Sequence, residues 1–290
     1  MSLDSFESIF QQFPSVSADE WKNKIIKDLK GEAFDKLIWH TKEGIEVLPF
    51  YTKEDNLNYQ LQIPEKQTIG WQITESIIVE DILTANSEAL DALQNGATAL
   101  IFNLVYDFAN KEQIQNLLRD IKTDIAPVYF DTYFDECKPL LESIVKNSCP
   151  LIIHVSQEET IIDELVNALK QGVKQKENNI HFHFHIHQNY FFEISKLCAF
   201  IFFCKQICEL NNQAYNIYIQ CETSYKKFSV DDEYSNILRN TTAAMSAVLG
   251  GCDSLIITSH DKLIGESPFG KRIARNINHI LQHESYFTEI

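Results

Sequence analysis

The feature that most constrains this fold is a regular alternation of short β-branched runs with amphipathic helical segments, beginning after Gly70. Each run has the length of a strand, and each following segment carries apolar residues at helical spacing. Consecutive strands joined in this way must run parallel, because each helix returns the chain to the edge from which it started. The predicted strands span residues 72–79, 98–104, 126–131, 150–156, 180–186, 215–221 and 253–259.

Seven strand–helix units approach an α/β, TIM-type (β/α)8 barrel, and 290 residues suit such a barrel. No GxGxxG or GxxxxGK[ST] motif opens a helix, which disfavours a nucleotide-binding open sheet. The eighth strand would have to come from YFTEI at 286–290, so closure of the barrel depends on five residues. We expect the barrel at residues 66–290.

An N-terminal helical arm is predicted at residues 1–65. Ser17 is placed to cap a helix that begins at Ala18, and Glu20 completes the pattern of a capping box. The polar stretch that follows contains no apolar run of the kind that forms a core strand. The arm is therefore expected to lie on a surface and to contact another subunit.

Charge and cysteine content narrow the possible partners and the compartment. Lys and Arg total 25 against 41 Asp and Glu, and a net charge of −16 excludes nucleic acid and anionic membrane surfaces as partners. No run reaches the roughly 18 apolar residues of a membrane span. The seven cysteines form no CxxC pair and follow no apolar signal segment, which indicates reduced thiols in a cytoplasmic protein.

The stretch HFHFHIH at 181–187 places four histidines two residues apart on one predicted strand. Histidines at i and i+2 point to the same face and can share a metal ion. A barrel metallohydrolase is one interpretation, with ligands His154, His183, His185 and Asp261. However, the outer histidines of the stretch lie ~20 Å apart on an extended strand, too far for one site. The alternative is a strand whose histidines face a polar lumen.

Several segments resemble the methylmalonyl-CoA mutase family, in the same order. They are GWQITESI (70–77), FFEISK (191–196), DDEYSN (231–236), RNTTAAMSAVLGGCDSL (239–255) and FGKRIARNINHILQHES (269–285). The arm segment from Trp21 to Thr52 also resembles this family. The resemblance implies a barrel through which the coenzyme A chain threads, and chemistry that depends on adenosylcobalamin. It also implies that the histidine strand is an ordinary barrel wall, in which only His187 matches a family histidine.

The resemblance also implies that the catalytic positions have changed. Cys198 stands where the family has an arginine that contacts coenzyme A, which removes a charge-assisted contact. Ile256 and Thr258 stand where the family has histidine and asparagine, and Glu222 replaces a glutamine. The family's Tyr-His pair is reduced to His154. No catalytic residue is therefore expected, and the remnants of a substrate pocket are His154, His187, Glu222 and Thr258.

The resemblance thus suggests a non-catalytic small subunit that forms a heterodimer with a large methylmalonyl-CoA mutase subunit. The large subunit would interconvert methylmalonyl-CoA and succinyl-CoA. No DxHxxG spacing for a lower cobalt ligand occurs here, so adenosylcobalamin is expected on the partner chain. Two alternatives stay open: an active acyl-CoA isomerase component that uses a separate cobalamin-binding chain, and the metallohydrolase.

Overall fold

The chain divides into two compact units, Met1–Gln62 and Ile63–Ile290, and each is described by itself. The computed structural model describes residues 16–52, 55, 70–108, 110–132, 134, 138–144, 152–175, 179–212 and 215–289.

The first unit consists of short elements. Helix α2 (Ala18–Asp28) is followed by the 3-10 helix η1 (Phe34–Leu37) and by strands β1 (Trp39–His40) and β2 (Glu46–Val47), which pair antiparallel. The predicted capping box is confirmed: the Ser17 hydroxyl accepts from the Glu20 amide, and the Glu20 carboxylate accepts from the Ser17 amide. None of the described residues of this unit is buried, so its apolar side chains form no core of their own.

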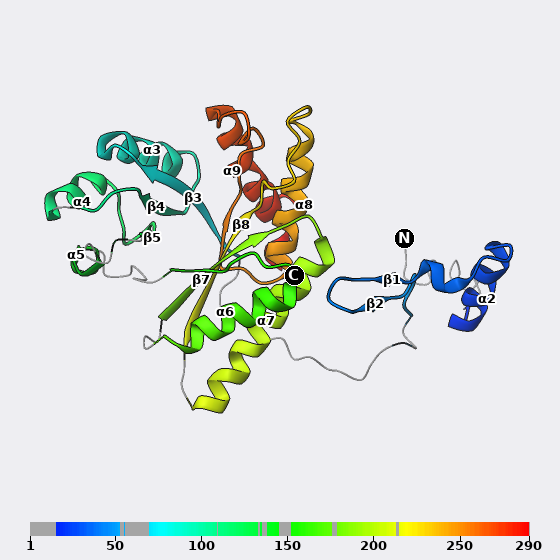
Figure 1. Cartoon of the computed structure of the whole chain (residues 1–290). Coiled ribbons are helices and arrows are strands. Elements are labelled where there is room, and N and C mark those ends of the chain that lie inside the picture. Colours follow the sequence, from blue (N-terminus) through cyan, green and yellow to red (C-terminus); the bar gives the residue numbers. More distant parts are fainter. Residues whose placement is uncertain are drawn as a thin grey trace, which may run out of the picture. The chain divides into compact units, whose positions relative to one another are not determined.

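The second unit contains all seven predicted strand–helix pairs, and in Figure 1 its helices lie outside its strands. Its strands are β3 (Gln72–Val79), β4 (Ala99–Leu104), β5 (Val128–Asp131), β6 (Ile152–His154), β7 (Asn179–Ile186), β8 (Asn216–Thr223) and β9 (Ser254–Ile256). Its helices are α3 (Ile82–Gln94), α4 (Lys111–Leu117), α5 (Lys138–Ile144), α6 (Ile161–Val173), α7 (Tyr190–Asn211), α8 (Ser235–Leu249) and α9 (Pro268–His283).

The strands form one parallel sheet in the order β5-β4-β3-β9-β8-β7-β6. The two edge strands approach each other at their carboxyl ends, where His154 Nε2 on β6 lies 2.9 Å from Asp131 Oδ1 on β5. A side-chain hydrogen bond thus links the edges where a closed barrel would have a backbone ladder. The second unit is a nearly closed TIM-type barrel.

The segment that would have to supply an eighth strand forms no strand over its described residues, 286–289, so the barrel stays incomplete there. Residues Phe287–Glu289 make the 3-10 helix η4, after Tyr286 with a positive φ of 54°. Strand β9 instead pairs directly with β3, through Gln72↔Ser254 and Ile73↔Leu255, which leaves no place between them for another strand. The opening in the barrel therefore lies between β5 and β6.

Side chains alternate along β7 between the lumen and the surrounding helices. Phe182 and Phe184 face outward, and each ring centroid lies 4.8 Å from that of Phe200 on α7. His181 and His183, which alternate with these phenylalanines, face the lumen, as the period of two along a strand requires. The largest core cluster lies between the sheet and helices α6 to α9, and a second one packs around α3 and α4. The histidine strand is therefore a barrel wall with an imidazole-lined inner face.

The cysteines in the described part of the chain form no disulfide; they are Cys198, Cys204, Cys208, Cys221 and Cys252. Cys137 and Cys149 lie outside the described residues. Among the helices that the structure describes, none combines the length and the apolar character needed to cross a membrane.

Candidate functional site

A layer of ring side chains fills the lumen at the amino-terminal half of the strands. We call Gln72, Tyr129, His181 and Tyr218 the aromatic layer. The His181 ring centroid lies 4.7 Å from that of Tyr218 and 5.1 Å from that of Tyr129, and the two tyrosine rings are 5.3 Å apart. Both tyrosine hydroxyls donate a hydrogen bond to Gln72 Oε1. The donor–acceptor distance is 2.6 Å for Tyr218 and 3.3 Å for Tyr129. These side chains block the lumen at the amino-terminal end of the barrel.

Burial determines the protonation states in this layer. It lowers the pKa of His181, which is 0% exposed, to about 3, so that the ring is neutral at physiological pH. It also raises the pKa of Tyr218, which stays a hydroxyl. The layer is thus uncharged and tightly packed.

Above the aromatic layer lies a cavity of ≈ 300 Å³. It opens at the carboxyl ends of the strands, the end at which TIM barrels carry their active sites. Its polar lining comes from five strands and the loop after β9, and includes Thr74, Ser76, Asn103, Asp131, His183, His185, Glu222, Thr258, Ser259 and Lys262. Ile101 and Ile256 supply an apolar part of the wall.

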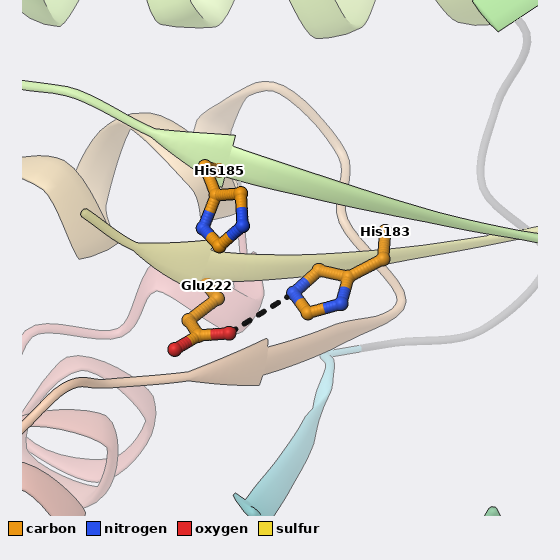
Figure 2. Close-up of side chains that lie close together, drawn as sticks. All are labelled: His183, His185 and Glu222. Atoms are coloured by element: carbon orange, nitrogen blue, oxygen red, sulfur yellow. Dashed lines mark ion pairs between the residues drawn. The ribbon is translucent and has the colours of Figure 1, made fainter. Parts of the chain in front are cut away.

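Two histidines and one carboxylate converge in this cavity (Figure 2). His183 and His185 come from β7 and Glu222 from β8, where it is the register partner of His185. The Nε2 atom of His183 lies 3.1 Å from Glu222 Oε2. One ligand atom from each of the three side chains lies within 4.8 Å of the others. We call these three residues the His-His-Glu cluster.

The charges in the cluster follow from burial and from mutual contact. Burial lowers the pKa of His185 to about 4, so its imidazole is neutral. Burial alone would raise the pKa of Glu222, but the close contact with the His183 imidazole and the charge of Lys262 outweigh it and hold this pKa below its ordinary value. The cluster therefore presents an ionised carboxylate beside a neutral imidazole.

The predicted residue His154 lies next to the cluster. Its ring centroid is 5.2 Å from that of His183, while its Nε2 atom contacts Asp131. That hydrogen bond raises the pKa of His154, against the effect of its partial burial. Asp131 was not anticipated from the sequence, although its place at the end of a predicted strand is where barrel site residues are found.

The other predicted site residues lie in different surroundings. Thr258 lines the cavity, but its hydroxyl donates to the Thr223 carbonyl and its amide to the Thr223 hydroxyl. His187 follows β7, and its pKa is lowered to about 4 by burial and nearby lysines. The Asp261 carboxylate accepts from the hydroxyls of Ser259 and Ser267 and from the Ser267 amide, at the start of α9. Of the four predicted metal ligands, the structure gathers His183 and His185, with Glu222 rather than Asp261.

Comparison with known proteins agrees with the motifs in the sequence. The sequence model of the family described as methylmalonyl-CoA mutase matches residues 139–290. The methylmalonyl-CoA mutase small subunit of Porphyromonas gingivalis is 27% identical over 371 aligned residues, which cover 98% of this chain and 60% of that protein. The methylmalonyl-CoA mutase of Rhizobium meliloti is 35% identical over 130 residues, which cover 42% of this chain and 18% of that protein.

The chain thus spans less than two thirds of the length of either relative. Among solved structures, dihydropteroate synthase from Stenotrophomonas maltophilia aligns with a TM-score of 0.47 and 11% identity, covering 74% of this chain and 93% of that one. The barrel assignment rests on the strands of this chain itself. From the family match and the ordered motifs together, the chain belongs to the methylmalonyl-CoA mutase family.

Proposed function

We propose that this chain is a non-catalytic barrel subunit of the small-subunit type. It supports a large subunit, which binds adenosylcobalamin and interconverts methylmalonyl-CoA and succinyl-CoA. The relative that covers 98% of this chain carries the name of a small subunit, which supports this proposal. The observation that carries it is the aromatic layer, which occupies the barrel axis.

A coenzyme A chain that threads the barrel, as the family resemblance implies, would need a continuous channel along the barrel axis. Here the axis is crossed by Tyr129, His181 and Tyr218, whose centroids are 4.7–5.3 Å apart, the spacing of packed rings. The two tyrosines are also held by hydrogen bonds to Gln72. To admit a ligand chain, these rings would have to leave their packed positions and break those bonds. The layer therefore supports a barrel that does not bind acyl-CoA along its axis.

The cavity above the layer supports the same conclusion. Ile256, where the family resemblance implies a histidine, packs in the lumen with Ala99, Ile101 and Tyr129. Thr258, where it implies an asparagine, has its hydroxyl and amide engaged by Thr223. Neither residue offers a free polar group to a thioester. Thr258 thus serves the scaffold.

The described residues also do not fit adenosylcobalamin. A cavity of ≈ 300 Å³ lies at the lower end of small-molecule pockets, which span about 300–1,000 Å³. We therefore assign the cofactor to the large subunit.

The arm, residues 1–65, is the proposed contact with the large subunit. Its described part has no buried residue but carries a series of large apolar side chains that are at least 39% exposed. Such a surface is typical of a segment that buries its apolar side chains against a partner. These side chains are Val16, Trp21, Ile26, Leu37, Trp39, Ile45, Leu48 and Tyr51.

Co-purification with a large subunit from the same genome tests this assignment. Deletion of residues 1–35 should abolish the complex, and Ile26→Asp together with Ile45→Asp should weaken it. The matched control is Leu238→Asp, which changes an equally apolar side chain that is 71% exposed on the barrel helix α8. A complex that survives the deletion would refute the arm as the interface.

Turnover tests the absence of catalysis. This chain, a cobalamin-binding chain and adenosylcobalamin are mixed with methylmalonyl-CoA, and succinyl-CoA is followed by mass spectrometry. We expect no product above the level seen without this chain. Product that depends on this chain would instead establish an active acyl-CoA isomerase component.

A further inference from the structure

The His-His-Glu cluster has the geometry of a metal site that the proposed function does not use. His183 and His185 stand two residues apart on β7 and face the lumen, and Glu222 reaches them from β8. Among the described residues, one group of at least three potential ligands is close enough to hold a metal ion, and it is this cluster. The three residues lie on adjacent paired strands, so the backbone ladder fixes their spacing.

The spacing of the ligand atoms suits a small divalent ion. Zinc binds imidazole nitrogen and carboxylate oxygen at about 2.0–2.2 Å, so two ligands of a tetrahedral site are about 3.3 Å apart. The atoms of His183 and Glu222 are 3.1 Å apart, and the remaining separations reach no more than 4.8 Å. Small side-chain rotations would bring all three atoms to coordination distance.

The simpler interpretation is an ion pair between His183 and Glu222, with His185 as a bystander. That contact gives His185 no role, and both ring nitrogens of His183 stay buried without a hydrogen-bond partner of good geometry. A buried polar nitrogen without a partner lowers the stability of the folded chain. A metal ion would use both imidazoles and the carboxylate at once.

We propose that His183, His185 and Glu222 bind one divalent transition-metal ion, for which zinc has the matching donor preference. Two imidazoles and one carboxylate form a three-ligand set that leaves one coordination position open. All three side chains line the ≈ 300 Å³ cavity, so the open position faces that space. This inference concerns binding alone and does not depend on the role of the chain as a subunit.

Titration of the metal-stripped full chain with zinc chloride tests the proposal. Isothermal calorimetry should show one ion per chain at micromolar affinity or tighter, and cobalt(II) should produce the visible absorption of a four- or five-coordinate ion. His185→Gln and Glu222→Gln should each weaken zinc binding by more than about 100-fold, since even the loss of an outer-shell partner costs about 10–100-fold.

The matched control is His187→Gln, which removes the next imidazole along the same segment, outside the cluster. It should leave the affinity unchanged. The proposal is overturned if the folded wild-type chain binds no zinc, or if the cluster variants bind as tightly as wild type. It is also overturned if His187→Gln weakens binding as much as they do.

X-ray absorption of the wild-type zinc complex decides the matter if a variant fails to fold. The proposal requires a shell of nitrogen and oxygen at about 2.0–2.2 Å. The cysteine thiols are the competing ligands, and zinc–sulfur distances of about 2.3 Å would overturn the proposal.

Discussion

The neutral His181 at the centre of the aromatic layer makes the stability of the barrel depend on pH. Burial lowers its pKa from 6.5 to about 3 in the folded chain. Between these values the unfolded chain binds a proton that the folded chain excludes. This contribution to stability is therefore fully present above pH 6.5 and is lost as the pH falls toward 3.

The size of the effect follows from these two pKa values. At pH 5, unfolding takes up nearly one proton at this ring, so the free energy of unfolding falls by about 1.3 kcal/mol per pH unit. Integrated from pH 7.5 to pH 5, the loss due to His181 is about 2 kcal/mol. His181→Gln keeps a polar side chain that cannot be protonated in this range, and it should remove this contribution.

Urea unfolding followed by circular dichroism, repeated from pH 5 to pH 7.5, measures the effect. The slope of unfolding free energy against pH should be smaller in His181→Gln than in wild type by about 1.3 kcal/mol per unit near pH 5. Other buried histidines contribute equally to both proteins and cancel. Equal slopes in wild type and His181→Gln would refute the assignment of a neutral, buried ring.

Three further substitutions test the packing of the barrel by thermal unfolding. Lys196→Met should destabilise the barrel by about 3–5 kcal/mol, because it leaves two buried carboxylates without their counter-charge. In the wild-type chain the Lys196 ammonium lies 2.6 Å from Glu193 and 3.3 Å from Glu164. Gly250→Ala should cost about 1–3 kcal/mol, since the new Cβ would lie 2.8 Å from Cβ and Cδ1 of Leu197. Asn278→Ala should cost about 1–3 kcal/mol by removing the acceptor, at 2.9 Å, of the buried Trp71 indole N–H.

Exposed neighbours on the same helices serve as controls. Lys205→Met on α7 and Asn276→Ala on α9 should change stability by less than about 0.5 kcal/mol. A loss as large as that of the buried partner would contradict the electrostatic and hydrogen-bond explanations. Unchanged stability in Gly250→Ala would mean that the facing leucine moves aside without cost.

The elements of the barrel could be predicted from the sequence because their signals are local. Apolar spacing identified all seven strand–helix pairs, and Ser17 and Glu20 marked the start of α2. The alternation along HFHFHIH likewise indicated that every second residue shares a face. Each of these patterns involves residues within one or two turns or a single strand.

Only the tertiary structure determined the features that depend on residues far apart in the sequence: strand pairing, register and the side chains that meet in the lumen. The incomplete closure follows from the direct pairing of β9 with β3, a contact between residues about 180 positions apart. The pairing of His183 with Glu222 depends on the register of β7 against β8, and the aromatic layer joins Gln72 to Tyr218 across 146 positions. Register and inward convergence arise only when the sheet curves into a barrel, so spacing along one chain does not contain them.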